Sequence, residues 1–424
     1  MENYFCNDIK KGIKFHFIKT NKFKTNLLLI FLTTKLEEES VTMNALIPAV
    51  LRRGSSNLKT QEEISMELEE MYGASFNCGI EKKGDNQIIK IYLNTINNNF
   101  LPQNEDNLKK SINMLFDILF NPLLIDNKFK NEYVESEKNN IKQIIEGRKD
   151  SKATYSFDRC IEEMYKDNSY SLYKFGSLEK LNNINSENLY KQYLNLINNC
   201  KIDIFLSGDI SEDIKNEIIN NENILKLNNR NPNFLLNNLE NRIKSKKQEQ
   251  VIFESLDINQ GKLVIGLDIL NEEKKDVYTA VVYNMILGGL PSSKLFQNVR
   301  EKHSLAYTAS SCYIKQKANI FIKCGIDFEN YEEALKIIKE QIEDMKIGLF
   351  NDTIIEEAKK NIISSFNSIQ DEQDTEIVYY YLQELSGEKI SIEEYISFIN
   401  NVTKEDIINL ANKIQINTIY FLKN

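Results

Sequence analysis

The chain has 424 residues, of which 42% are hydrophobic and 27% are charged, and only 5 are Pro. This balance excludes a disordered chain, and the length indicates about two or three globular domains. Acidic residues outnumber basic ones, 62 to 53, and no block of Lys and Arg is present, so the composition argues against a nucleic-acid-binding protein.

The sequence also bears on location and redox state. The first residues lack a basic segment that leads into an apolar run, and no apolar stretch approaches the ~20 residues needed to span a bilayer. The six cysteines show no CxxC spacing, which favours reduced thiols over disulfides or a thiolate zinc site. We therefore expect a cytoplasmic protein that has no membrane contact.

Strand and helix patterns alternate through the first half of the chain. Residues 13–18 and 26–32 predict two strands that pair with each other. A helix is expected from about 42 to 53 and ends at Gly54, and the spacing of Thr60 and Glu63 is that of a capping box at the start of another helix. The remaining expected elements are strands near 75–82 and 87–94, helices at 105–120, 127–149, 151–166 and 186–198, and a strand at 202–206.

The pattern restarts after a polar, Asn-rich segment at 226–248, which predicts a linker. The second half is expected to contain strands at 250–255, 262–269, 305–313, 318–326 and 416–422, helices at 276–288, 293–301, 330–347, 351–369 and 371–386, and two more short helices. Because this order repeats the first half, we predict two homologous domains, residues 1–225 and 249–424. Each is expected to be of the α+β class, with a mainly antiparallel sheet and helices packed on one face.

One segment in each half combines a Gly-containing turn with a short helix and a strand. In the first half it begins at 51–56, and in the second half it spans 287–311 and includes Val299-Arg300-Glu301-Lys302-His303-Ser304-Leu305-Ala306-Tyr307. Taken singly, these residues have ordinary explanations. Gly288-Gly289 is typical of a helix end, Arg300 of a solvated cation near a helix C-terminus, and Tyr307 of a half-buried strand residue.

Taken together, residues 287–307 resemble the C-terminal-half signature of the insulinase (pitrilysin) family of zinc metallopeptidases, whose fold is LuxS/metallopeptidase-like. Gly208-Asp209 at the end of the first half and Glu137-Lys138 in a long helix extend the resemblance along the chain. By this match, Arg300 and Tyr307 are substrate-binding residues that hold the carbonyl of a peptide bond near the metal, where negative charge develops.

The metal motif of that family, HxxEH, is absent because the chain contains only two His residues. The resemblance places the two His ligands at Ala45 and Ala49, the general base at Pro48 and the third ligand near Ile144. None of these side chains binds zinc or transfers a proton. Pro48 also fits poorly inside a helix, which predicts a kink or a later helix start.

The two His residues have other expected roles. His16 lies in an alternating strand between Phe15 and Phe17, and we expect it to be exposed or hydrogen bonded within the sheet rather than a metal ligand. His303 lies inside the second-half motif, where it either contacts a bound peptide or is exposed in a loop.

The resemblance is strongest to a zinc-free branch of the family that is associated with modification of elongation factor P. It implies a chain that binds no cofactor and is not an enzyme on its own. It also implies a heterodimer with a zinc-bearing, YmfH-like paralogue, which closes as a clamshell around a peptide substrate and acts as a metalloendopeptidase. The alternative is a peptide-binding or scaffold protein that has no peptidase role. An independent hydrolase is disfavoured, because no Ser/His/Asp or Cys/His set is compatible with the positions of the two His residues.

Overall fold

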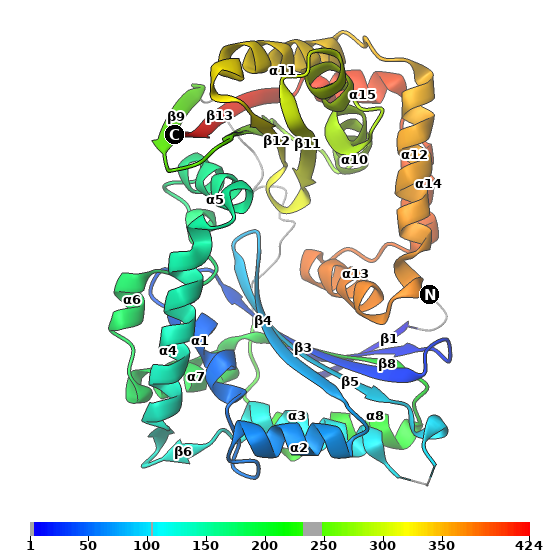
Figure 1. Ribbon diagram of the computed structural model, residues 1–424. Coiled ribbons are helices and arrows are strands. Elements are labelled where there is room, and N and C mark those ends of the chain that lie inside the picture. The colour runs from blue at the N-terminus through cyan, green and yellow to red at the C-terminus, as the bar shows by residue number, and fades with distance from the viewer. Residues whose placement is uncertain (1–3, 103–104, 232–247) are drawn as a thin grey trace. The chain divides into compact units, whose positions relative to one another are not determined.

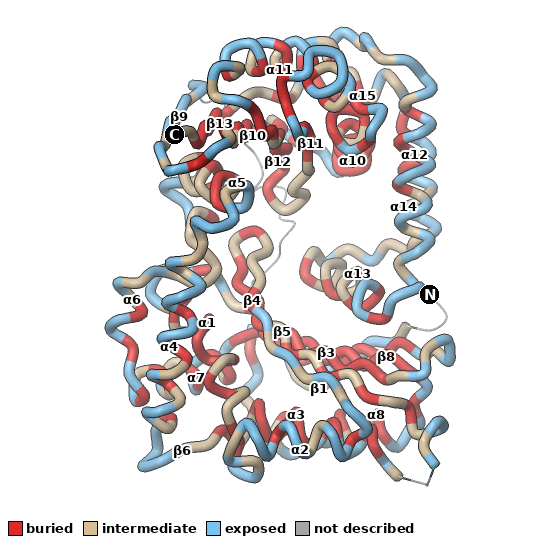
Figure 2. Tube along the Cα trace, in the orientation of Figure 1, coloured by how far each residue is buried: buried red, intermediate tan, exposed pale blue. Residues whose placement is uncertain are grey.

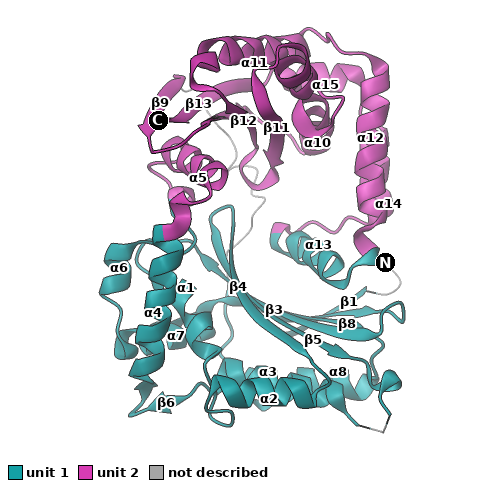
Figure 3. Ribbon diagram, in the orientation of Figure 1, with its two compact units in different colours: residues 1–146, 172–234, 371–385 teal, residues 147–171, 235–370, 386–424 magenta. Residues whose placement is uncertain are grey.

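The computed structural model describes residues 4–102, 105–231 and 248–424. The chain divides into two compact units, each assembled from separate stretches of sequence (Figure 3). Unit 1 contains residues 1–146, 172–234 and 371–385, and unit 2 contains residues 147–171, 235–370 and 386–424. Most of the predicted linker lies outside the described residues. Within the part of the chain that is described, no helix is both long enough and apolar enough to cross a membrane.

Unit 1 is built on a six-stranded sheet (Figure 1). The strand order is β1 (Tyr4–Lys10), β2 (Ile13–Lys19), β8 (Lys201–Gly208), β3 (Thr25–Lys35), β5 (Asn86–Ile96) and β4 (Ser75–Lys83). The predicted pairing of 13–18 with 26–32 is wrong, because β8 lies between β2 and β3. All residues of β8 are buried (Figure 2), and a strand of that kind belongs in the interior of a sheet whatever its place in the sequence.

One face of this sheet packs against helices. Leu28, Ile30 and Ile204 of the sheet share a core with Leu46 and Leu115 of the helices. The elements that contribute to this core from outside the sheet are α1 (Val41–Leu51), α2 (Gln61–Glu70), α3 (Asn107–Phe120), α4 (Asn131–Glu146), α6 (Leu178–Asn182), α7 (Ser186–Asn199), α8 (Glu212–Ile219), α9 (Glu222–Lys226) and the small hairpin β6 (Leu124–Ile125) and β7 (Lys128–Phe129).

Unit 2 repeats this topology. Its strand order is β9 (Gln250–Ser255), β13 (Ile414–Lys423), β10 (Gly261–Ile269), β12 (Asn319–Ile326) and β11 (Ala306–Ile314). This order matches β2-β8-β3-β5-β4 of unit 1, and in both sheets only the first pair, β2–β8 or β9–β13, is parallel. The duplication and the α+β class are therefore confirmed, and β1 is an extra edge strand of unit 1.

Most helices of unit 2 also gather on one face of its sheet. Leu263, Ile265 and Leu267 of β10 point into the core that these helices share. The helices are α10 (Asp276–Asn284), α11 (Tyr331–Lys346), α12 (Asp352–Asn367), α14 (Ile392–Asn400) and α15 (Lys404–Ala411).

The opposite face of each sheet is covered by a helix from the other half of the sequence. On unit 1, the Tyr381 ring of α13 (Gln373–Ser386) stacks on Phe31 at 3.8 Å, and its hydroxyl is hydrogen bonded to Thr33 Oγ1 at 2.6 Å. On unit 2, Cys160 and Met164 of α5 (Lys152–Met164) pack in a second core with β10, β12 and β13. α5 is the third long helix after the β4–β5 hairpin, and α13 is the third long helix after the β11–β12 hairpin. The two repeats therefore exchange equivalent helices.

A glycine in β10 allows α5 to lie close to the unit 2 sheet. A Cβ at Gly266 would lie 2.7 Å from Met164 Sδ and 3.1 Å from Phe321 Cε1. Overpacking of a filled core typically costs about 1–3 kcal/mol, and we expect Gly266→Val to lower the free energy of unfolding of unit 2 by this amount. Urea unfolding combined with hydrogen exchange across α5 and β10 measures the effect. Gly79→Val is the control, because a Cβ at Gly79 meets nothing within 4 Å, and equal losses at the two sites would contradict the prediction.

Candidate functional site

The second-half motif forms two helical turns followed by an edge strand. α10 continues into a π-helical turn, η5 (Met285–Gly289), and a second π-helical segment, η6 (Phe296–Lys302), leads to β11 at the edge of the sheet. Gly288 has a specific role, because a Cβ there would lie 2.6 Å from the backbone nitrogen of Ser311 in β11. π-Helical turns are rare and frequently occur at functional sites. Gly288 thus allows close helix–strand packing, in addition to the helix end that the sequence predicted.

Arg300 lies on the exposed side of η6. Leu295 and Val299 are fully buried in the unit 2 core and fix the orientation of the helical segment. The Arg300 guanidinium carbon lies 4.6 Å from the ring centre of Phe296, and its Nε lies 3.6 Å from a carboxylate oxygen of Glu301. The Arg300 side chain nevertheless remains 44% exposed. Its two contacts limit the mobility of the guanidinium, which is still accessible to a ligand.

Tyr307 occupies a bulge in β11. Ala306 is opposite Ile326 and Thr308 is opposite Gly325, so Tyr307 is the extra residue between two consecutive pairs. Bulges re-aim side chains and occur often beside functional sites. Tyr307 is 63% exposed, and its hydroxyl makes no hydrogen bond with any described residue. This exposure argues against the simple half-buried strand residue considered from the sequence.

A tight turn joins Arg300 and Tyr307 in one short segment. Ser304 has a φ of 54°, and its N–H donates to the Arg300 carbonyl at 3.0 Å. His303, at the C-terminal end of η6, is exposed. A guanidinium and a phenol are both hydrogen-bond donors, and both suit a carbonyl oxygen on which negative charge develops. The segment therefore presents two exposed hydrogen-bond donors.

Helix α1 contains three of the positions that the resemblance assigns to the metal site. Ala45 is 2% exposed, Pro48 is buried and Ala49 is half-buried. α1 begins at Val41 and continues through Pro48, so the later start predicted from this proline does not occur. Pro48 has no N–H to donate, but its carbonyl accepts from the Arg52 N–H at 3.2 Å, which continues the helix. Helix α1 thus presents only hydrocarbon at these positions, which does not fit a zinc ion.

Helix α4 does not complete a metal site either. Ile144, at the position of the third ligand, is 43% exposed. The buried carboxylate of this helix belongs to Glu137, which accepts hydrogen bonds from Arg53 Nε and, at 3.0 Å, from Asn140 Nδ2. Sequence reasoning missed the Arg53–Glu137 pair because 84 positions separate its members. Among residues 4–102, 105–231 and 248–424, no group of three or more His, Cys, Asp or Glu is placed to hold a metal ion.

His16 belongs to a buried polar network in unit 1. Its Nδ1 is hydrogen bonded to the hydroxyl of Tyr4 at 2.8 Å, and its Nε2 lies 3.0 Å from Asp203 Oδ1. Lys201 Nζ donates to both oxygens of Asp203, at 2.8 and 2.9 Å, and also lies 3.3 Å from Glu384 of α13. His16 is therefore hydrogen bonded within the sheet, as predicted, and is buried rather than exposed.

The members of this network shift one another's pKa values. Burial alone would lower the pKa of His16, but the hydrogen bond and charge of Asp203 outweigh it and raise that pKa. Burial also opposes ionisation of Asp203, yet Lys201 and His16 lower its pKa below the ordinary value. Because His16 and Asp203 are fully buried, they cannot contact a substrate.

Known proteins match this chain over its whole length. Residues 183–362 match the family model described as the peptidase M16 inactive domain. The chain is 34% identical over 423 residues to the probable inactive metalloprotease YmfF of Bacillus subtilis, which covers 99% of this chain and 98% of that protein. A crystal structure of a conserved protein from Enterococcus faecalis has a TM-score of 0.88 at 29% identity and covers 100% of this chain and 99% of its own. The peptidase M16 inactive domain from Pseudomonas fluorescens shares the fold, with a TM-score of 0.79 at 16% identity over 99% and 98% of the two chains.

Proposed function

Since this chain belongs to the peptidase M16 (insulinase) family and resembles its inactive members, we propose that it is the non-catalytic subunit of a zinc peptidase. One contrast carries the proposal. Arg300 and Tyr307 are both exposed, whereas Ala45, Pro48 and Ala49 stand at the positions that the resemblance assigns to ligands and base. A subunit equipped to grip a substrate but not to bind a metal requires a partner that supplies the metal and the base.

In the proposed heterodimer, a zinc-bearing paralogue of the YmfH-like type closes with this chain around a peptide. Arg300 and Tyr307 donate hydrogen bonds to the carbonyl oxygen of the peptide bond under attack. The contact of the Arg300 guanidinium with Phe296 limits the orientations that it samples. Tyr307 adds a neutral donor whose hydroxyl is not occupied by another described residue. Both groups position the peptide carbonyl and stabilise the negative charge that develops on its oxygen. Activation of the attacking water is assigned to the partner.

Zinc analysis of the free chain and of the complex tests this division of labour. The isolated chain is expected to contain no stoichiometric zinc, and EDTA should leave its Tm unchanged, because its α1 and α4 positions lack ligands. Co-purified with an HxxEH-containing paralogue, it should form a complex that holds about one zinc ion and cleaves peptides. Stoichiometric zinc on the free chain, or peptide cleavage by the free chain, would overturn the proposal. A complex that binds peptides but never cleaves them would favour the scaffold alternative.

A further inference from the structure

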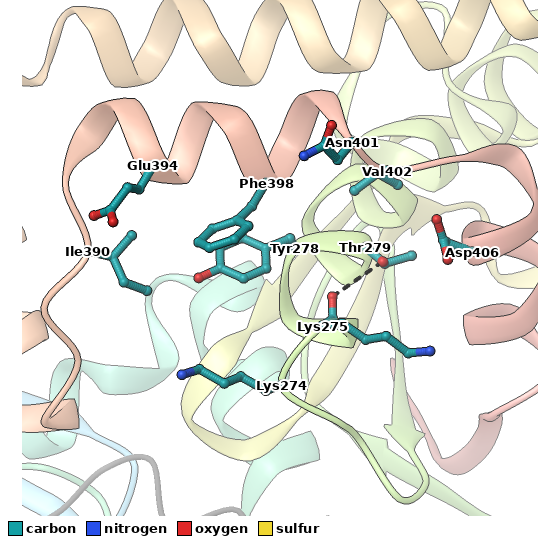
Figure 4. Close-up of a pocket in the computed structure, with 10 residues that line it drawn as sticks. All are labelled: Lys274, Lys275, Tyr278, Thr279, Ile390, Glu394, Phe398, Asn401, Val402 and Asp406. Carbon is teal, nitrogen blue, oxygen red and sulfur yellow. Dashed lines mark hydrogen bonds between the residues drawn. The ribbon is translucent and has the colours of Figure 1, made fainter.

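Unit 2 contains a cavity of about 520 Å³ between the first turn of α10 and helix α14 (Figure 4). It is lined by residues that lie outside the Arg300 and Tyr307 segment, and the proposed function does not use them. Its volume falls within the range of about 300–1,000 Å³ that is typical of small-molecule sites. The cavity is therefore a candidate small-molecule site that is distinct from the Arg300 and Tyr307 segment.

The floor of this cavity is aromatic. The rings of Tyr278 and Phe398 lie 4.6 Å apart at an interplanar angle of 35°, and Tyr395 packs on Tyr278 edge-on at 5.3 Å. Tyr278 is 7% exposed, whereas Phe398 is 44% exposed. The Phe398 ring therefore remains accessible to a ligand beside the buried Tyr278 ring. Ile390 and Val402 extend the apolar lining at opposite ends (Figure 4). An apolar side chain of a ligand fits this floor, because aromatic rings stack favourably on such faces.

Charges of opposite sign stand on opposite sides of the floor at one end of the cavity. The other two charged lining residues already have partners, since Lys275 Nζ lies 3.8 Å from Glu273 and Asp406 accepts from the Thr403 N–H at 2.9 Å. Figure 4 shows Lys274 on the α10 side and Glu394 on the α14 side, with the Tyr278 hydroxyl at the same end of the cavity. Lys274 makes no ion pair with any described residue. One oxygen of Glu394 accepts the N–H of Ser391 at 2.8 Å, which leaves the other oxygen for a ligand. Burial, followed by the charges of Glu388 and Glu394, raises the pKa of Tyr278 to about 12, so its hydroxyl stays a donor at neutral pH.

A simple anion would pair with Lys274 but would be repelled by Glu394. A simple cation would pair with Glu394 but would be repelled by Lys274. A zwitterion with an apolar body satisfies both charges at once. We propose that this cavity binds a short apolar peptide with free termini, its side chain on Phe398 and Tyr278, its carboxylate paired with Lys274 and its ammonium group with Glu394. This site is separate from the proposed peptidase role, because it is complete within unit 2 and needs no partner.

The dipeptide Leu-Phe, titrated into the full chain by calorimetry, tests the proposal. N-acetylation removes the group that pairs with Glu394, and C-amidation removes the group that pairs with Lys274, so each should weaken binding about tenfold. Phe398→Ala should also weaken binding by about tenfold or more, because it removes half of the apolar floor. Free phenylalanine presents the same charges on a smaller body, and its affinity relative to Leu-Phe separates an amino-acid site from a peptide site.

The Lys274→Gln variant provides the sharpest control. In it, amidated and free Leu-Phe should bind equally, while Lys336→Gln on the exposed surface of α11 should retain the wild-type preference. Since Phe398 and Lys274 are exposed, circular dichroism and Tm are expected to stay at wild-type values. Binding that is insensitive to both termini, or that survives Phe398→Ala unchanged, would overturn the proposal. If Phe398→Ala fails to fold, the comparison of free and capped dipeptides on the wild-type chain decides alone.

Discussion

The substitution Asp203→Asn is expected to lower the free energy of unfolding of unit 1 by about 3–5 kcal/mol, because it breaks a buried charge network. Asp203 is fully buried, and its carboxylate accepts from Lys201 at 2.8 and 2.9 Å and lies 3.0 Å from His16 Nε2. An amide at this position leaves the Lys201 ammonium without its main counter-charge. Among the carboxylates that the structure describes, only Glu384, at 3.3 Å, then forms an ion pair with it. Removal of one partner from such a pair costs more than the pair contributes in net stability.

Urea unfolding measures this loss, and hydrogen exchange along β2 and β8 assigns it to unit 1. Glu187→Gln is the matched control, because Glu187 pairs with Lys191 at 2.6 Å but both side chains are largely exposed. Solvent screens that pair, and no measurable change is expected. A loss at Asp203 no larger than at Glu187 would show that the network does not stabilise the sheet.

The same network determines how stability depends on pH. Because the pKa of Asp203 is lowered on folding, its contribution is complete above the unfolded value of about 3.9 and disappears as the pH falls through the lower folded value. Because the pKa of His16 is raised, its contribution is complete below about pH 6.5 and disappears as the pH rises through the higher folded value. Unit 1 should therefore be most stable between these limits, and His16→Gln should remove the decline on the alkaline side.

Local sequence patterns predicted the elements well where a local cause exists. The Thr60 side chain caps α2 by accepting from the Glu63 N–H at 3.1 Å, and Gly84, with a φ of 55°, forms the predicted turn between β4 and β5. In the candidate capping box, however, the Glu63 carboxylate accepts from Lys59 N–H rather than from Thr60. Strand β1 was missed because most of its residues are exposed and show no alternation.

Features that depend on distant parts of the chain were not predictable from periodicity. An amphipathic helix has the same pattern whichever sheet it covers, so the exchange of α5 and α13 left no local signal. The polar network around His16 could not be predicted either, because its members are far apart in the sequence. Lys14 Nζ donates to Glu384 Oε1 at 2.7 Å, and these residues are 370 positions apart. At the candidate site, the motif predicts Arg300 and Tyr307 as substrate-binding residues, but helical periodicity could not distinguish the π-helical form of η6 from an α-helix, nor reveal the bulge at Tyr307.

In the complex with a zinc-bearing paralogue, Arg300→Ala is expected to reduce kcat for peptide cleavage by about 10²–10³-fold, the loss that follows removal of one oxyanion donor. Tyr307→Phe removes only a neutral hydroxyl and should cost less. Arg300→Lys keeps the charge but loses the planar guanidinium that lies over Phe296, so it should restore activity only in part. Single-turnover measurements on complexes of equal zinc content separate these effects on the chemical step from failed assembly.

Lys302→Ala is the matched control for this series, because Lys302 is an exposed cation in the same helical segment, two positions from Arg300. If general positive charge at η6 attracted the substrate, both substitutions would raise KM alike and salt would diminish both effects. A directed hydrogen bond to the reacting carbonyl predicts a different result, in which kcat falls for Arg300→Ala alone and the loss persists at high salt. Equal kinetics for the Arg300→Ala and Lys302→Ala complexes would remove Arg300 from the site, and the exposed Tyr307 alone would not justify a substrate-gripping role.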